Sequence, residues 1–192
     1  KIGKQHNAHD YFLRRAGSYE QQEKLERLYH GGFSHSNRFY IGDIFNENDI
    51  EGADFNSSYP FCLLCFRYPG KFVPLGRDVK PDYIIRNAED YGFIFRAKFF
   101  NIHLKQHYFP MPCLQASKCD FSINADIDNG RIKKAGYVSL LLTEQDLIVL
   151  DSIYEWDKQS VCEEVEVSAK EYLPRWFTDY VYKRYEEKTY MK

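Results

Sequence analysis

The sequence has 192 residues, enough for one domain or two closely packed subdomains, and its 44% hydrophobic and 17% aromatic content excludes a disordered polypeptide. No apolar run approaches the roughly 20 residues of a membrane-spanning helix, and no secretion signal is present, so we expect a soluble, cytoplasmic protein with no membrane partner. The 26 basic and 28 acidic side chains nearly cancel, which argues against nonspecific nucleic-acid binding over the whole surface.

Helix signals dominate the first third of the chain. Ser18 is a favourable N-cap for a helix that runs to about residue 29. A short strand is predicted over 52–54, directly before a helix over 57–67 in which apolar side chains recur at helical spacing. Pro69 and Gly70 end that element.

Strand signals dominate after residue 76. Apolar and polar side chains alternate over 93–98, as in a half-buried strand. The later elements that we predict are a turn at 128–130, a strand over 137–142, a helix capped by Thr143, a strand over 161–167 and a helix that starts near Pro174. The pattern indicates an α+β protein whose domain boundaries are soft.

The most informative motif is the heptapeptide of residues 54–60, Asp-Phe-Asn-Ser-Ser-Tyr-Pro. It resembles the first polymerase motif of family B DNA polymerases, Asp-x-x-Ser-Leu-Tyr-Pro, and departs from it at Ser58. The resemblance implies that Asp54 is a catalytic carboxylate that binds two Mg²⁺ (or Mn²⁺) ions, with the backbone carbonyl of Phe55 as a further ligand. Hard oxygen ligands suit these ions, which neutralise charge on the phosphates during nucleotidyl transfer.

The same resemblance implies a nucleotide site at the start of the helix that follows Asp54. Ser57, Ser58 and Tyr59 are its candidate residues, and the backbone amides of Ser58 and Tyr59 would face the triphosphate. Tyr59 would lie beneath the deoxyribose and exclude a 2′-hydroxyl by steric clash. Each residue alone is more often structural, and it is the ordered heptapeptide that favours the functional interpretation.

A second motif lies upstream, where residues 29–32 read Tyr-His-Gly-Gly. This resembles the Tyr-x-Gly-Gly or Tyr-x-Gly-Ala signature of protein-primed family B polymerases. It implies that Tyr29, Gly31 and Gly32 contact the DNA, since glycine lets a backbone approach a strand closely and tyrosine offers a stacking surface. Gly-Gly after a helix is also a common terminator, so this motif is weak without the first one.

In the protein-primed branch, an insertion called the first terminal-protein region follows the first polymerase motif. The resemblance therefore implies a partial palm, a strand and a helix around Asp54, within residues 1–70 and a mixed strand and helix insertion at 71–192. Such insertions bind the priming (terminal) protein and duplex DNA. The basic candidates for DNA contact here are Arg96, Lys98, Lys105, Lys118, Arg131, Lys133 and Lys134, although such charges are usually a solvated face.

Two motifs that the family needs do not occur in these 192 residues: the Asp-Thr-Asp hairpin and the fingers sequence Lys-x-x-x-Asn-Ser-x-Tyr-Gly. We therefore predict part of a DNA-directed DNA polymerase of phage, prophage or plasmid origin, whose partners are DNA, deoxynucleoside triphosphates and a terminal protein. The fragment alone should be inactive, because one carboxylate cannot hold a metal pair.

Two alternatives remain at this point. The first is a non-enzymatic docking module for a priming protein or DNA, in which the heptapeptide is a relic. The second is a small metal or redox protein built on Cys62 and Cys65, which have suitable spacing but no second pair. Asp126-x-Asp128-x-Gly130 imitates a calcium loop or the second polymerase motif, but it lacks the glutamate of the former and coincides with a turn signal.

Overall fold

The structure is a computed structural model that describes residues 10–11, 17–29, 40, 42–44, 52–55, 57–105 and 112–190. Its helices are α2 (Tyr19–Leu28), α3 (Ser58–Cys65), α4 (Pro81–Asn87), α5 (Glu144–Ile153), α6 (Arg175–Tyr190) and the short 3₁₀ helix η3 (Ala116–Lys118). Its strands are β1 (Arg67–Pro69), β2 (Val73–Pro74), β3 (Tyr91–Leu104), β4 (Cys119–Ile123), β5 (Asp126–Asp128), β6 (Arg131–Thr143), β7 (Tyr154–Glu155) and β8 (Val161–Tyr172).

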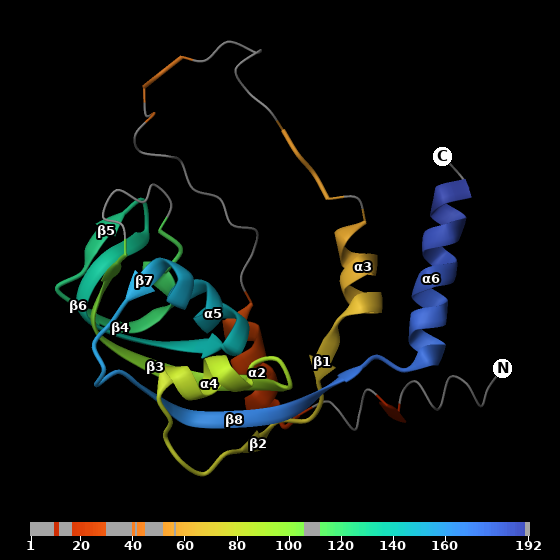
Figure 1. Cartoon of the computed structure of the whole chain (residues 1–192), viewed down its shortest axis with the longest axis horizontal. Helices are drawn as coiled ribbons and strands as arrows, with labels where there is room; N and C mark the ends of the chain where they lie inside the picture. Colours follow the sequence, from red (N-terminus) through yellow and green to blue (C-terminus); the bar gives the residue numbers. More distant parts are fainter. Residues whose placement is uncertain are drawn as a thin grey trace.

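The eight strands of these described residues form one antiparallel sheet with the order β1-β8-β3-β6-β4 (Figure 1). The shorter strands β2, β5 and β7 pair with β8, β6 and β3 respectively. The turn predicted at 128–130 joins β5 to β6, with Asn129 and Gly130 at positive φ values of 46° and 75°. Such a pair of left-handed residues matches the twist of two antiparallel strands.

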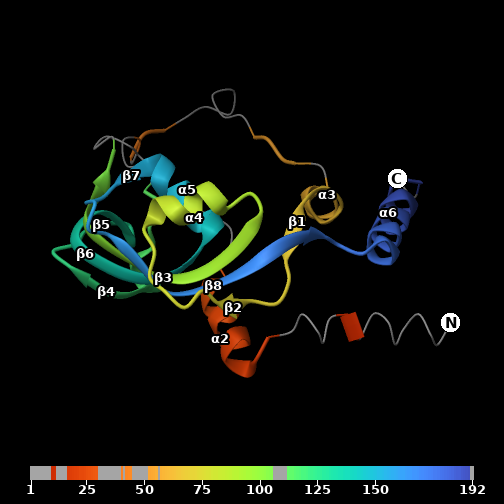
Figure 2. The same ribbon diagram turned by 60° about the horizontal axis from the view of Figure 1, so that its bottom comes forward.

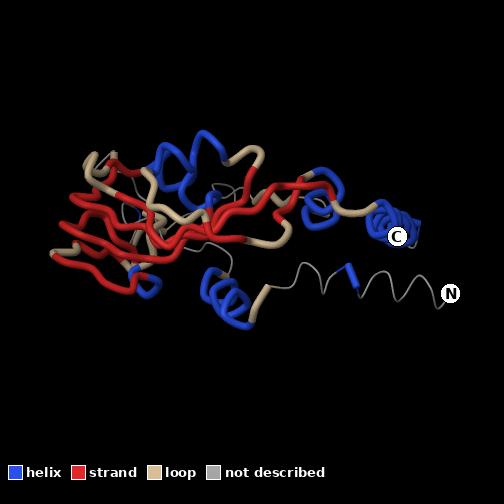
Figure 3. The backbone as a smooth tube through the Cα atoms, turned by 90° about the horizontal axis from the view of Figure 1, so that it is seen from below, coloured by secondary structure: helices blue, strands red, loops and turns tan. Residues whose placement is uncertain are grey.

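The main core lies between one face of the sheet and the helices α4 and α5, on the side opposite α2 (Figures 2 and 3). Alternate residues of β3 point into this core, and Phe93, Phe95 and Phe99 are at most 1% exposed. Tyr154 is also buried, and its hydroxyl donates to the carbonyl of Ile132 at 2.6 Å. The body of the protein therefore has a continuous core of its own.

Helix α2 lies on the other face of the sheet (Figure 3). Its buried side chain, Leu28, packs with Ile94 and Leu141 and with the partly buried Phe72. This second apolar cluster is much smaller than the main core.

A β-bulge in β8 determines which side chains share the α2 face. Glu164 has a φ of 50°, and the pairing with β3 shifts between Ile94 and Arg96. Cys162 and Val165, on either side of the bulge, both lie in the main core. The extra residue therefore places Glu163 and Glu164 together on the opposite face, in reach of the cations of β3.

The structure confirms most predicted elements and corrects two, one of which is the helix predicted over 57–67, because α3 ends at Cys65 and residues 67–69 form β1. The N-caps are correct, since Ser18 accepts from the amide of Gln21, and Thr143 forms a capping box with Asp146. The strand predicted over 52–54 is wrong, because residues 52–55 are irregular and have no strand partner. A short extended segment needs such a partner to satisfy its backbone groups. The structure does not test the predicted boundary between residues 70 and 71.

Helices α3 and α6 lie side by side at one end of the molecule, connected to the body by β1 and β8 (Figures 1 and 2). Both are fully described, and neither contains a buried residue. The apolar side chains of these two helices are therefore at most partly buried by the described residues. None of the helices formed by the described residues is long and apolar enough to cross a membrane.

Candidate functional site

The heptapeptide motif occupies an exposed loop and the first turn of α3. Asp54 and Phe55 are exposed in the loop, where Phe55 retains 87% of its accessible surface. Asn56 lies outside the described residues. Asp54 is thus not sealed inside an apolar core, and its carboxylate is open to solvent and to a ligand.

The start of α3 presents backbone donors. The first helical hydrogen bond is donated by the Phe61 amide to the Ser57 carbonyl at 3.1 Å. The amides of Ser58 and Tyr59 precede this bond, and Pro60 has no N–H, so α3 offers these two amides no acceptor. They lie at the positive end of the helix dipole, where an anionic group is favoured.

Ser57 has a strained backbone. Its φ of 56° and ψ of 41° are in the left-handed region, and its side chain does not cap α3. For a residue other than glycine, this conformation costs on the order of 1 to 2 kcal/mol. Such strain is concentrated at ligand-contacting positions in proteins, which makes Ser57 a position to test rather than an ordinary helix start.

Tyr59 points into solvent from the first turn of α3, with 84% of its surface exposed. An ordinary core aromatic on an amphipathic helix would be buried. Most of the Tyr59 side chain is therefore accessible, and it does not belong to a core of the described residues.

The described residues do not make a complete metal site. No group of three or more His, Cys, Asp or Glu side chains among them is arranged to hold an ion. Asp54 offers the hard oxygen that Mg²⁺ prefers, but a metal pair needs further carboxylates. The residues present therefore do not by themselves fit the two ions that the heptapeptide implies.

Cys62 and Cys65 lie on α3 at the border of a cavity of about 590 Å³. The same cavity is also lined by the buried ion pair between Lys170 and Glu144, whose Nζ and Oε1 atoms are 2.8 Å apart. Both cysteines have free thiols, and among the described residues they join no metal-binding cluster. The structure therefore gives no support to a metal or redox centre at this pair.

The upstream motif begins where α2 ends. Tyr29 has extended backbone angles and is 76% exposed, whereas Gly31 and Gly32 lie outside the described residues. The side chain of Lys118 donates to the Tyr29 carbonyl at 3.0 Å and to the Arg27 carbonyl at 3.1 Å. The start of this motif is therefore held by a residue far away in the sequence.

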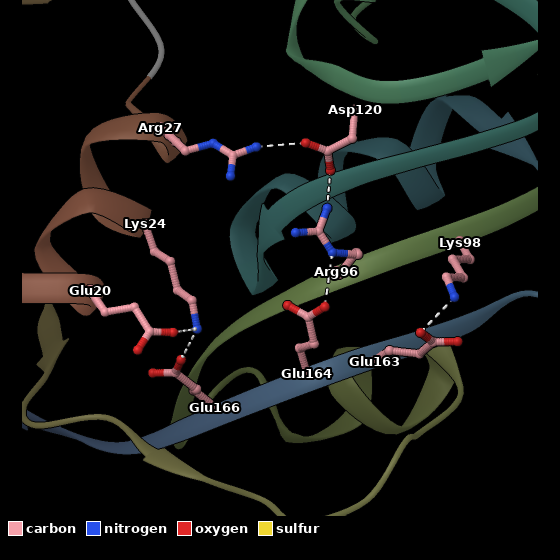
Figure 4. Close-up of polar contacts among 9 residues, drawn as sticks. All are labelled: Glu20, Lys24, Arg27, Arg96, Lys98, Asp120, Glu163, Glu164 and Glu166. Carbon is pink, nitrogen blue, oxygen red and sulfur yellow. Dashed lines mark hydrogen bonds and ion pairs between the residues drawn. The ribbon is translucent and has the colours of Figure 1, made fainter.

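Most basic candidates for DNA contact already have partners in the chain. Lys98 pairs with Glu163 at 2.6 Å, and Arg96 contacts both Asp120 and Glu164 (Figure 4). The remaining contacts are Lys105 to the carbonyl of Asp151, Lys118 to the carbonyls of Arg27 and Tyr29, Arg131 to the carbonyl of Cys113, and Lys133 to Asp126. Lys134 is exposed on β6. Six of these seven cations thus contact other groups of the chain, and a DNA contact for any of them stays a prediction.

Sequence reasoning missed the residues that attach α2 to the sheet. Glu166 is only 7% exposed and accepts from Lys24 at 2.6 Å and from Gln21 at 2.8 Å. Asp120 contacts both Arg27 and Arg96. No short sequence pattern predicts such contacts, because each contact joins residues that are distant in the sequence.

No protein-family model matches this sequence. No curated protein matches it either. Among solved structures, the fold is similar to part of "Phi29 DNA polymerase complexed with primer-template DNA and incoming nucleotide substrates (ternary complex)", with a TM-score of 0.47 and 19% identity over 86% of this chain. The chain spans 27% of that polymerase chain.

Proposed function

We propose that this chain is part of a protein-primed family B DNA polymerase and that Asp54 supplies one carboxylate of its nucleotidyl-transfer site. The observation that carries the proposal is the combination of the heptapeptide with its setting. Its acidic residue and its tyrosine are both exposed, beside a helix start at which the amides of Ser58 and Tyr59 have no acceptor within α3.

The chemistry assigned to each residue follows from its atoms. The amides of Ser58 and Tyr59 bind phosphate oxygens of the incoming nucleotide through the positive end of α3. The ring of Tyr59 lies against the deoxyribose and leaves no room for a 2′-hydroxyl. When bound, Mg²⁺ or Mn²⁺ would supply charge neutralisation at the phosphates, held by Asp54, the Phe55 carbonyl and carboxylates from outside the described residues.

The DNA and the terminal protein are the proposed macromolecular partners. Tyr29, with Gly31 and Gly32, contacts the DNA strand near the catalytic site. The remainder of the chain, from about residue 71, corresponds to the insertion that binds the terminal protein and the duplex. The polymerase would act on deoxynucleoside triphosphates in the host cytoplasm.

The direct test is nucleotide incorporation by the full-length protein with Asp54→Ala. We expect incorporation to fall by a factor of about 10³ or more, since a residue that acts on the transition state lowers the rate directly. Asp43→Ala is the matched control, because Asp43 is another exposed aspartate of the same region. The control should retain normal incorporation and both variants should bind DNA. Substantial incorporation by Asp54→Ala would refute the assignment.

A non-enzymatic docking module is the second candidate, favoured by the separate core of the body and by the lack of a metal cluster among the described residues. Under this alternative, the full-length protein would bind duplex DNA or a priming protein but would incorporate no nucleotide in either Mg²⁺ or Mn²⁺. Incorporation by the wild-type protein would exclude it.

A further inference from the structure

Helix α2 has little apolar surface with which to hold itself on the sheet. Leu28 is the buried residue of α2, and it packs against Ile94, Leu141 and Phe72. Polar side chains of α2 also contact two strands: Lys24 contacts Glu166 of β8, and Arg27 contacts Asp120 of β4 (Figure 4). Because the apolar contact is small, these polar contacts determine whether α2 stays in place.

Lys118 acts as a C-terminal cap for α2, although it lies in η3. The last carbonyls of a helix have no partner within the helix. The ammonium group of Lys118 takes two of them, those of Arg27 and Tyr29, at 3.1 and 3.0 Å. A cation is favoured at this end by the helix dipole. The contact also fixes the carbonyl of Tyr29 itself, the first residue of the Tyr-x-Gly-Gly motif.

Asp120, two residues further along the same segment, makes a second connection. One of its carboxylate oxygens is 2.6 Å from Nη2 of Arg27, and the other contacts Arg96 of β3. Arg96 in turn contacts Glu164 at the β8 bulge, at 3.2 Å (Figure 4). The carboxylate of Asp120 thus joins the last turn of α2 to the centre of the sheet.

Both contacts come from a single short segment, η3 with the start of β4, and both end on the last turn of α2. A cavity of about 330 Å³ lies between these elements, lined by Arg27, Lys118, Asp120 and Leu141 among others. The contact is therefore polar and solvent-accessible rather than a packed apolar interface. Such contacts weaken as ionic strength rises, whereas apolar packing does not.

We propose that Lys118 and Asp120 are positioning residues that latch the end of α2 to the sheet and thereby fix Tyr29. The latch is ionic, so salt loosens it. This inference rests on the proposed function only where it assigns Tyr29 a contact with DNA; the latch itself is independent of that assignment. Lys118 accordingly serves the DNA-contact motif through the backbone of Tyr29 rather than by touching DNA.

The test measures amide hydrogen exchange at Leu28 and Tyr29 in the 192-residue chain. Lys118→Met removes the ammonium group and keeps the apolar stem, and Asp120→Asn removes the charge with little change of shape. Each should speed exchange at these amides about tenfold, since hydrogen bonds to charged groups contribute more than neutral ones. Lys158→Met, at an exposed lysine of a distant turn, is the control and should leave exchange unchanged.

Two further readouts separate a latch from general destabilisation. Raising NaCl from about 0.05 M to about 0.5 M should speed exchange at Leu28 and Tyr29 in the wild type and much less in Asp120→Asn. Lys118→Arg, which keeps the charge, should restore slow exchange in part. Amides of β3, such as that of Phe95, should be unaffected in every variant. Unchanged exchange at Leu28 and Tyr29 in both Lys118→Met and Asp120→Asn would overturn the proposal.

In the full-length polymerase, Lys118→Met should raise the KM for template-primer with little change in kcat, because only the DNA contact is loosened. If exchange becomes faster while DNA binding and KM stay unchanged, the proposed latch is supported and the proposed DNA contact of Tyr29 is refuted. If Asp54→Ala retains incorporation, the proposed function fails whatever the exchange experiment shows.

Discussion

The body of the protein and the α3–α6 helix pair differ sharply in how their side chains are buried. In the body, Phe93, Phe95 and Phe99 are at most 1% exposed and belong to one continuous core. In the helix pair, both helices lack buried residues, and Phe61 and Tyr180 are each 56% exposed. The heptapeptide motif begins the helix pair and not the body.

This difference separates stability from the candidate chemistry. The free energy of unfolding of the body comes from its own core and does not depend on the motif. The motif gains little from burial in the described chain, since exposed aromatic rings contribute little to folding. Substitutions in the two regions should therefore change different quantities.

The largest expected stability effect comes from the body core. Phe95→Ala should lower the free energy of unfolding by about 3 to 5 kcal/mol, because it removes a fully buried ring and leaves a cavity. Phe61→Ala is the matched change in α3 and should cost about 0.5 kcal/mol. Denaturant titration followed by circular dichroism measures both. Equal losses would show that the helix pair is as much part of the core as β3.

A buried ion pair gives the next largest effect. Glu144 is 5% exposed, pairs with Lys170 at 2.8 Å and accepts from the Phe93 amide at 2.7 Å. Glu144→Gln should cost about 2 to 4 kcal/mol, because it leaves the buried ammonium of Lys170 without a counter-ion. Glu155→Gln, at the exposed pair with His103, should cost less than about 0.5 kcal/mol. Similar midpoints for the two variants in a denaturant titration would contradict this.

Alkylation of the cysteines should also distinguish the body from the α3–α6 helix pair. Burial raises the pKa of the Cys162 thiol to about 12 and that of Cys113 to about 11. Cys65 is exposed on α3. Iodoacetamide at about pH 8 should therefore alkylate Cys65 in the native protein and Cys162 only after unfolding. Peptide mass spectrometry identifies the sites, and rapid native alkylation of Cys162 would contradict the burial of the core.

The same raised pKa values predict how stability depends on pH. A thiol whose pKa is higher in the folded state than its usual value of 9.0 binds its proton more tightly when folded. The contribution of such a thiol to the free energy of unfolding is fully present below about pH 9. For Cys162, this contribution is lost as pH rises toward 12. Cys162→Ala should accordingly flatten the decline of the unfolding midpoint above about pH 9, whereas Cys65→Ala should not change it. An identical decline in both variants would show that other groups control the alkaline limit.

Local signals in the sequence predicted the elements whose stability is local. The caps at Ser18 and Thr143 are correct because an N-cap depends on residues within one turn. The alternation over 93–98 and the turn at 128–130 are correct for the same reason. The bulge at Glu164 could not be predicted, because it arises only from pairing with β3.

The candidate site was predictable only as a motif. The heptapeptide identified Asp54 and Tyr59 as candidates, but the strand expected before Asp54 is absent because no neighbouring strand pairs with residues 52–55. The latch formed by Lys118 and Asp120 had no signal in the sequence, since it depends on the tertiary position of η3 against α2. Long-range contacts of this kind are set by the fold as a whole.

The proposed polymerase site holds both the Asp54 carboxylate and a tyrosine, Tyr59, that selects the sugar of the incoming nucleotide. The most direct measurement of this site is the ratio of ribonucleotide to deoxynucleotide incorporation by full-length Tyr59→Val. A change in substrate choice is decisive because a misfolded variant loses activity on both substrates and cannot gain a new one. We predict that Tyr59→Val raises this ratio about a hundredfold, whereas Tyr59→Phe, which keeps the ring, leaves it unchanged. An active Tyr59→Val enzyme with the wild-type ratio would contradict the assignment.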